Sequence, residues 1–164
     1  MKKLFYLLLF ISSSAYSQDN TELAKQKVRE AVQLMDAGKY KESIVILEDC
    51  MKLDPDNYMY AYEIAYAQVL QKEYEKALKT LTKAKKYKVS SSQVYQMSGN
   101  CYSYMGKPDK AIKEYEEGMK RFPNAGNLHL EKGNIYLQKN EYNDAVENYR
   151  KGVEVDPMFS SNYF

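Results

Sequence analysis

Apolar residues recur along this chain at the spacing of an α-helix. Ile112, Tyr115 and Met119 fall three or four positions apart, with charged residues between them, and the same spacing returns in residues 142–155. Such spacing places the apolar side chains on one face of a helix, and no stretch alternates as a half-buried strand would. The chain is therefore predicted to be all-α, with helices near residues 24–37, 40–53, 58–71, 74–87, 92–105, 108–121, 126–139 and 142–155.

The pattern repeats with a period of 34 residues. Pro55, Pro123 and Pro157 fall on one lattice with this step, and Val89 occupies the remaining position. Small residues keep the same step in three columns, namely Ala31, Ala65, Gly99 and Gly133; Ser43, Ala77, Ala111 and Ala145; and Cys50, Ala84, Gly118 and Gly152. Small side chains are needed where two helices cross at the usual separation of about 8–10 Å. The period predicts a stack of helical hairpins.

The repeat closely resembles that of the tetratricopeptide-repeat (TPR) family, whose unit is a helix A, a turn and a helix B closed by proline. The best match is Gly133-Asn134-Ile135-Tyr136, followed by Glu141-Tyr142-Asn143-Asp144-Ala145 and Asp156-Pro157. The resemblance covers residues 24–157 and implies a right-handed superhelical solenoid of four units, at residues 24–57, 58–91, 92–125 and 126–159.

Three positions depart from the family pattern. Gln68 stands where an aromatic residue is usual, Val89 replaces a proline, and Pro108 replaces a tyrosine. Pro108 falls in the first turn of a helix B, where its missing N–H would have no helical partner, and Gly106 suits the preceding helix end. None of these residues is expected to break a helix.

The resemblance implies that the A helices form a concave surface that binds a protein or peptide. Its apolar and aromatic first half and amide-rich second half suit an extended or helical peptide with apolar anchors. An alternative for Tyr62 and Tyr66 is packing between units. The residues expected to line the groove are Val28, Val32, Met35, Met59, Tyr62, Tyr66, Val69, Gln96, Asn100, Leu130 and Asn134.

The first 17 residues have the order of an export signal. Lys2 and Lys3 precede the apolar run Leu4–Ile11, and a Ser-rich segment follows it. The run is shorter than the roughly 20 residues that cross a bilayer, and cleavage is expected between Ser17 and Gln18. A short polar lead-in, residues 18–23, would follow. An uncleaved anchor and a hydrophobic first core helix are the alternatives. Export predicts a periplasmic or otherwise extracytoplasmic protein without an integral membrane span.

Charge and composition argue against several functions. Without Lys2 and Lys3, the 24 basic residues fall to 22, which equals the number of acidic residues. Because the charges are balanced and mixed, no basic stripe is expected on the surface, and nucleic acid is not expected as a partner. The two cysteines and single histidine, Cys50, Cys101 and His129, fall in three different units, so neither a disulfide nor a metal or catalytic centre is expected. We expect no cofactor and no enzymatic activity.

One known group of relatives binds the carboxylate tails of cytosolic chaperones through a lysine and an asparagine in its first unit. Val28 and Val32 stand at those two positions here, and Gln96 replaces the lysine in the third unit beside Asn100. A clamp for two carboxylates is therefore not expected.

Two hypotheses for function stay open at this stage. The chain is either a binding scaffold or adaptor of the bacterial cell envelope, or the N-terminal part of a longer exported protein whose later domain is a sensor, anchor or enzyme. Residues 160–164 return to the phase of a fifth unit, which favours a longer chain. Self-association through an open C-terminal end is the alternative for covering the last unit.

Overall fold

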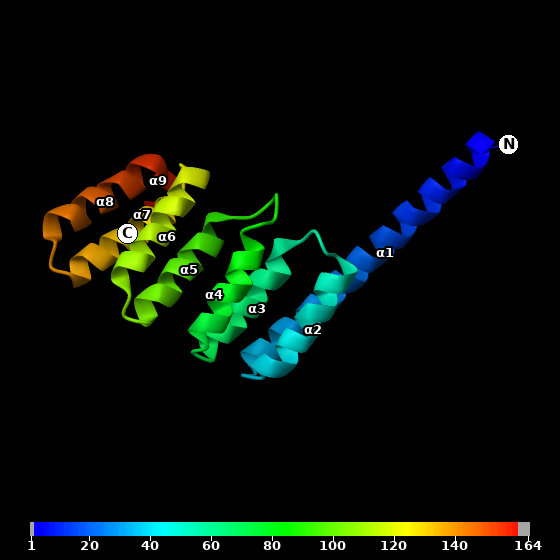
Figure 1. Cartoon of the computed structure of the whole chain (residues 1–164), viewed down its shortest axis with the longest axis horizontal. Coiled ribbons are helices and arrows are strands. Elements are labelled where there is room, and N and C mark those ends of the chain that lie inside the picture. The colour runs from blue at the N-terminus through cyan, green and yellow to red at the C-terminus, as the bar shows by residue number, and fades with distance from the viewer. Residues whose placement is uncertain (1, 161–164) are drawn as a thin grey trace.

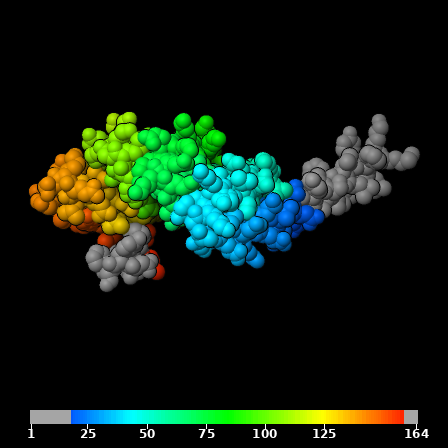
Figure 2. Space-filling view, turned by 90° about the horizontal axis from the view of Figure 1, so that it is seen from below, coloured from blue at the N-terminus to red at the C-terminus, as the bar shows by residue number. Residues whose placement is uncertain are grey.

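A computed structural model describes the backbone of residues 2–160 and the side chains of residues 18–158. Within this range the ordered elements are all helices: α1 (Lys2–Asp36), α2 (Tyr40–Leu53), α3 (Tyr58–Leu70), α4 (Tyr74–Ala84), α5 (Ser92–Tyr104), α6 (Pro108–Arg121), α7 (Gly126–Gln138), α8 (Tyr142–Val155) and α9 (Pro157–Ser160). Successive hairpins follow one another in a row (Figure 1), which confirms the all-α solenoid. Figure 2 shows the resulting elongated body.

The helices α2 to α8 begin at the residues predicted from the sequence, but α1 begins at Lys2 rather than near Ala24. No glycine or proline stands between Lys2 and Asp36 to interrupt the helix. The N-terminal part of α1 projects beyond α2 (Figure 1). The side chains of the expected leader, residues 1–17, and residues 161–164 of the expected fifth unit lie outside the described residues.

Each hairpin turns at a residue with positive φ. The amide of the next residue donates to the carbonyl five positions earlier, as from Lys39 N to Leu34 O at 2.8 Å and from Glu141 N to Tyr136 O at 2.9 Å. This Schellman arrangement closes helix A. The turn residues are spaced by one repeat and are Gly38 (74°), Lys72 (59°), Gly106 (68°) and Asn140 (62°).

Glycine lies where the two helices of a hairpin, or two neighbouring units, approach most closely. A Cβ atom at Gly133 would be 2.5 Å from Cε1 of Tyr149. One at Gly118 would be 2.7 Å from Cδ1 of Leu128 and from Cβ of Tyr95. Both distances are far below van der Waals contact, so only glycine fits. The small-residue columns therefore serve close helix crossings, as their spacing predicted.

The core extends along the stack, between units as well as within them. Leu47, Leu81, Leu128 and Tyr115 are among the fully buried side chains, and each belongs to a cluster that includes residues of a neighbouring unit. Cys50 and Cys101 are buried and both are free thiols, as predicted. Burial raises the pKa of Cys101 to about 12.

The segment between α4 and α5 differs from the other junctions. The helix α4 ends at Ala84, three residues before the predicted end, and Val89 stands where the other units have proline. Arg121 of α6 donates to the carbonyl oxygens of Lys85 (2.7 Å) and Tyr87 (2.9 Å). The guanidinium thus satisfies two carbonyls beyond the end of α4 and ties this segment to the next unit.

The outward face of α8 is apolar and has no unit packed over it in the described range. Val146 is 65% exposed and Val153 is 44% exposed. One repeat earlier, Ile112 is partly buried against the core cluster that spans units three and four.

Within the described part of the chain, no helix is both long enough and apolar enough to span a membrane.

Candidate functional site

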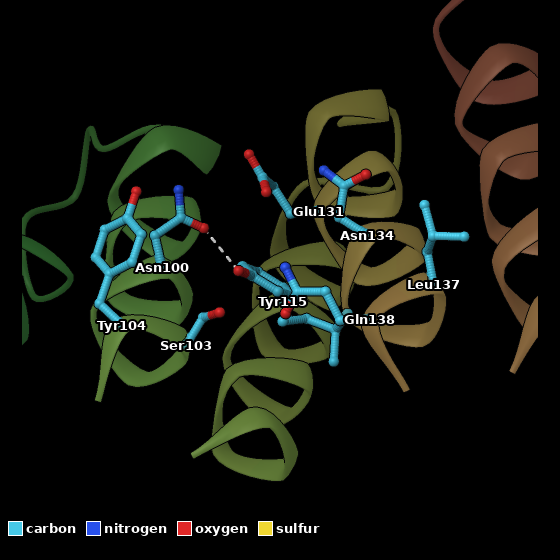
Figure 3. A pocket seen from close by; sticks show the side chains of 9 residues that line it. Asn100, Ser103, Tyr104, Tyr115, Glu131, Asn134, Leu137 and Gln138 are labelled. Carbon is cyan, nitrogen blue, oxygen red and sulfur yellow. Dashed lines mark hydrogen bonds between the residues drawn. The ribbon is translucent and has the colours of Figure 1, made fainter. Parts of the chain in front are cut away.

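Two adjoining cavities follow the A helices from the second unit to the fourth. The first, which we call the tyrosine cavity, lies between α3 and α5, and is lined by Tyr62, Tyr66, Val69, Gln93, Gln96, Met97, Asn100 and Tyr104. The second, the amide cavity, lies between α5 and α7 (Figure 3), and is lined by Asn100, Ser103, Tyr104, Tyr115, Glu131, Asn134, Ile135, Leu137 and Gln138. Asn100 and Tyr104 belong to both. The two cavities form one groove.

Six of the residues predicted for the groove line these cavities, namely Tyr62, Tyr66, Val69, Gln96, Asn100 and Asn134. Tyr66 is 43% exposed, so much of its ring faces solvent rather than packing between units. Tyr62 is half-buried and packs against the core cluster of the second and third units. The two tyrosines therefore differ: Tyr66 is open to solvent in the groove, whereas Tyr62 lines the groove and also packs between units.

The remaining predicted groove residues lie outside the two cavities. Val32 and Met59 are exposed, whereas Leu130 is half-buried. Val28 packs against the core cluster of the first unit. The prediction for Met35 is wrong, because this side chain is only 8% exposed. It lies three residues before the turn at Gly38 and offers almost no surface to a partner.

Tyrosines from the B helices reach the groove over glycines and hold its asparagines. The hydroxyl of Tyr115 donates to Oδ1 of Asn100 at 2.6 Å (Figure 3). One repeat later the hydroxyl of Tyr149 donates to Oδ1 of Asn134 at 2.9 Å. Because each oxygen is engaged, each side-chain amide is oriented with its Nδ2 toward the groove. Neither Nδ2 atom has a hydrogen-bond partner among the described residues.

A directed chain of hydrogen bonds joins α5 to α7 beside the two cavities. Ser92 Oγ donates to Oδ1 of Asn127 at 3.2 Å, and Asn127 Nδ2 donates to Oε1 of Gln96 at 2.8 Å. Gln96 Nε2 then donates to Oε1 of Glu131 at 2.8 Å. These hydrogen bonds fix the orientation of the Asn127 and Gln96 amides. They end on the carboxylate of Glu131, which accepts hydrogen bonds and donates none.

The hydroxyls of Tyr62, Tyr104 and Tyr115 have a raised pKa and stay protonated at neutral pH. Burial raises the pKa of Tyr62, and the charge of Glu63 adds to this effect. Burial also raises the pKa of Tyr115 and Tyr104, with the charge of Glu131 as the next cause for both. The groove therefore offers neutral hydroxyl and amide groups, which suit hydrogen bonding to a peptide backbone.

Among the lining residues that the sequence predictions missed are Tyr104, Tyr115, Glu131 and Gln138. Glu131 lies four residues after Asn127 and three before Asn134, so helical spacing alone places it on the same face. Tyr115 carries a weaker signal. It belongs to a helix B, and only the glycine at position 99 indicates that its ring passes across helix A.

The residues that most often provide catalysis or metal binding lie elsewhere. His129 lies beside Gly152 at the crossing of α7 and α8, and burial lowers its pKa, with Lys132 and Lys151 adding to the effect. No group of three or more histidine, cysteine or acidic residues in the described part of the chain is arranged to hold a metal ion.

Sequence models of the tetratricopeptide repeat match most of the chain. Two described as "Tetratricopeptide repeat" match residues 34–101 and 92–124, and one described as "TPR repeat" matches residues 133–164. The chain belongs to the tetratricopeptide-repeat family.

A curated TPR relative and two solved structures agree with this assignment. The "Small glutamine-rich tetratricopeptide repeat-containing protein 2" of Mycosarcoma maydis is 31% identical over 86 residues, which is 52% of this chain and 24% of that protein. The chain thus spans about a quarter of that relative's length.

Among solved structures, "Crystal structure of MamA" has a TM-score of 0.68 at 22% identity, over 91% of this chain and 86% of that one. A tetratricopeptide repeat protein from Parabacteroides merdae has a TM-score of 0.66 at 20% identity, over 82% of this chain and 54% of that one. The TM-scores establish a shared fold, and identities this low establish nothing beyond the fold.

Proposed function

We propose that this TPR protein is a non-enzymatic scaffold or adaptor of the bacterial cell envelope, which binds an extended segment of a partner protein along its A helices. TPR folds are typical of protein–protein interaction. The observation that carries the proposal is the groove, whose tyrosine cavity opens into an amide cavity through the shared residues Asn100 and Tyr104.

The two halves of the groove suit two parts of an extended peptide. Tyr66 and Val69 offer an apolar surface on which a side chain of the peptide can be buried. Burial of an aromatic or aliphatic side chain is the main source of affinity at such sites. Asn100 and Asn134 offer oriented Nδ2 donors for the carbonyl oxygens of the peptide backbone. Backbone pairing in one part and a pocket for a side chain in another is the usual arrangement for recognition of extended peptides.

Selection of short random peptides displayed on phage tests the groove. We expect the purified protein to enrich related sequences that carry an apolar or aromatic residue at a fixed position. The double variant Tyr66→Ala with Asn100→Ala removes one contact from each half and should lose this enrichment. The exposed residues Lys79 and Glu117, on the helices B, provide a matched double alanine control. Equal enrichment by both double variants would contradict binding in the groove.

Placement in the envelope rests on the residue order of the first 17 positions. A fusion of the chain to a reporter enzyme that is active only outside the cytoplasm tests export. N-terminal sequencing of the purified protein tests cleavage between Ser17 and Gln18. An inactive reporter, or a protein that retains Met1 in the cytoplasmic fraction, would contradict this part of the proposal.

The apolar face of α8 supports a second contact, self-association of two copies through this end. Val146 and Val153 are exposed there, whereas Ile112, one repeat before Val146, is packed by the next unit. Light scattering should show a concentration-dependent dimer that Val146→Lys converts to a monomer. A monomer at all concentrations would contradict self-association. It would favour the second candidate function, in which further repeats of a longer exported protein cover α8.

A further inference from the structure

Among its described lining residues the amide cavity has a single charged side chain, the carboxylate of Glu131. Its other lining residues are neutral, and the cavity holds about 350 Å³. In Figure 3 the Glu131 carboxylate lies between the amides of Asn100 and Asn134. The only formal charge among the described residues that line this part of the groove is therefore negative.

The positive side chains near Glu131 in the sequence are engaged elsewhere. Lys132 pairs with Glu116 of α6 at 2.7 Å, and Lys139 pairs with Glu141 at 3.0 Å. Glu131 itself forms no ion pair among the described residues. Its Oε1 accepts one hydrogen bond, from Gln96, and its Oε2 has no described partner. A half-buried carboxylate with one oxygen unpaired is a strong acceptor for an incoming cation.

The negative charge of Glu131 reaches two tyrosines that line the cavity, Tyr104 and Tyr115, and the nearby Tyr149. Tyr104, Tyr115 and Tyr149 all have a raised pKa, for which burial is the first cause and the charge of Glu131 the second. Ser103 Oγ and the side-chain oxygen of Gln138 offer further acceptors in the same lining. The ring of Tyr104, which is 60% exposed, offers an open aromatic face. Such a face attracts a guanidinium or ammonium group.

From this arrangement we infer that the amide cavity binds a basic side chain, arginine in preference to lysine, from the peptide segment whose backbone is held by Asn100 and Asn134. The inference rests on the proposed function and names the chemistry of the partner. Arginine is favoured because its planar group pairs with a carboxylate and stacks on an aromatic ring at once. An acidic peptide would bring like charge to Glu131, and one carboxylate is too few ligands for a metal ion.

Parallel peptide selections on the protein and two variants test the inference. Glu131→Gln keeps one oxygen that can accept from Gln96, and it replaces the other by a neutral NH2 group, which removes the charge. Glu117→Gln makes the same change on the exposed face of α6, outside the groove. We expect arginine or lysine at one fixed position in peptides selected by the protein and by Glu117→Gln. On Glu131→Gln this preference should disappear, while the apolar position persists.

A binding measurement on one selected peptide provides the second readout. Fluorescence anisotropy compares the peptide with a copy in which norleucine replaces the basic residue. The replacement should weaken binding to the protein about tenfold, as expected for a hydrogen bond to a charged group, and should leave binding to Glu131→Gln nearly unchanged. Comparison of all four pairs isolates the coupling between the two groups. Circular dichroism of the variant confirms that it is folded.

Two outcomes would overturn the inference in distinguishable ways. Selected peptides without a basic residue, or an equal loss on the protein and on Glu131→Gln, would refute the basic partner and leave binding in the groove intact. Failure of the protein to select any peptide above the level of the Tyr66→Ala, Asn100→Ala double variant would refute the proposed function and the inference with it.

Discussion

The ring of Tyr115 occupies the space that a side chain at Gly99 would need. A Cβ atom built at Gly99 would overlap Cε1 of Tyr115, which belongs to the other helix of the same hairpin. The hydroxyl beyond this crossing reaches Asn100, which directly follows the glycine. One contact between two helices thus joins the packing of the hairpin to the chemistry of the groove.

The first prediction concerns this contact. Gly99→Ala should lower the free energy of unfolding by about 1–3 kcal/mol, because the overlap with the ring outweighs the better helix propensity of alanine. Adding Tyr115→Leu should recover part of the loss, since Ala31 with Leu47 and Ala65 with Leu81 occupy the same positions in the first two units. Urea unfolding of both single variants and the double variant measures the coupling. If the stability losses of the two single variants simply add in the double variant, the predicted coupling between positions 99 and 115 is refuted.

The turn at Lys72 provides the second prediction. Its φ of 59° strains a residue that carries a Cβ atom, and the equivalent residues Gly38 and Gly106 avoid this cost. Lys72→Gly should stabilise the protein by roughly 0.5–1 kcal/mol, after allowance for the greater entropy of glycine in the unfolded chain. Lys79→Gly, on the exposed face in the middle of α4, is the control and should destabilise by about 1 kcal/mol. Thermal unfolding measures both, and a loss of stability in Lys72→Gly would contradict the strain argument.

Tyr66 and Leu81 should separate binding from folding. Leu81 is fully buried, so Leu81→Ala should cost about 2–5 kcal/mol of stability. Tyr66→Ala should cost about 1 kcal/mol or less, because much of the ring faces solvent, yet weaken a bound groove peptide by about 2 kcal/mol. Chemical unfolding and anisotropy with a selected peptide measure the two effects. Equal stability losses with unchanged binding would make Tyr66 a core residue.

Arg121 should control the segment between α4 and α5. Replacement by methionine keeps much of the side chain's length and removes both donors to the carbonyls of Lys85 and Tyr87. Stability should fall by about 1 kcal/mol, a modest value because the site is exposed. Amide hydrogen exchange should accelerate in residues 85–91 and change little in α7. The neighbouring exposed Lys120→Met is the control, and equal effects from both variants would contradict the role of Arg121.

His129 should make stability fall as the solution becomes acidic. Its pKa in the folded protein is lowered from 6.5, so between this value and the folded pKa the unfolded chain binds more protons. The stabilising contribution is therefore present above about pH 6.5 and is lost as the pH falls through the folded pKa. Urea midpoints across this range should depend less on pH in His129→Gln. The same dependence in both proteins would rule out His129 as the cause.

The sequence predicted the helices well, because the start of each helix from α2 to α8 is set by local signals that recur with the period. It missed the start of α1 and the end of α4. At α1 no residue interrupts the helix, and at α4 the chain is held by Arg121, 34 residues or more away from the carbonyls it binds. Such tertiary contacts leave no mark in the local pattern.

The groove residues were predicted only where the side chain comes from a helix A and its direction follows from its position on that helix. Tyr66, Val69 and Gln96 lie on the expected face, because a fixed position on a regular helix determines direction. Met35 has the same position in its unit as Val69, three residues before the equivalent turn, yet it is buried, so position on the helix alone does not determine exposure. The helical spacing of Ile112, Tyr115 and Met119 placed Tyr115 on the apolar face of its helix, which was correct for the ring and incomplete for the hydroxyl. Only the pairing of glycine with tyrosine could have indicated the second role.

The combination of glycine, asparagine and tyrosine at Gly99, Asn100 and Tyr115 returns one repeat later at Gly133, Asn134 and Tyr149. Duplication of a whole unit transmits all three residues at once. Stepwise mutation from an alanine-and-leucine unit has a narrower route, since tyrosine introduced first would meet the Cβ atom of alanine. Glycine must come first, and asparagine is held in place only once the hydroxyl is present. Sterics thereby set the order in which one kind of unit can evolve into the other.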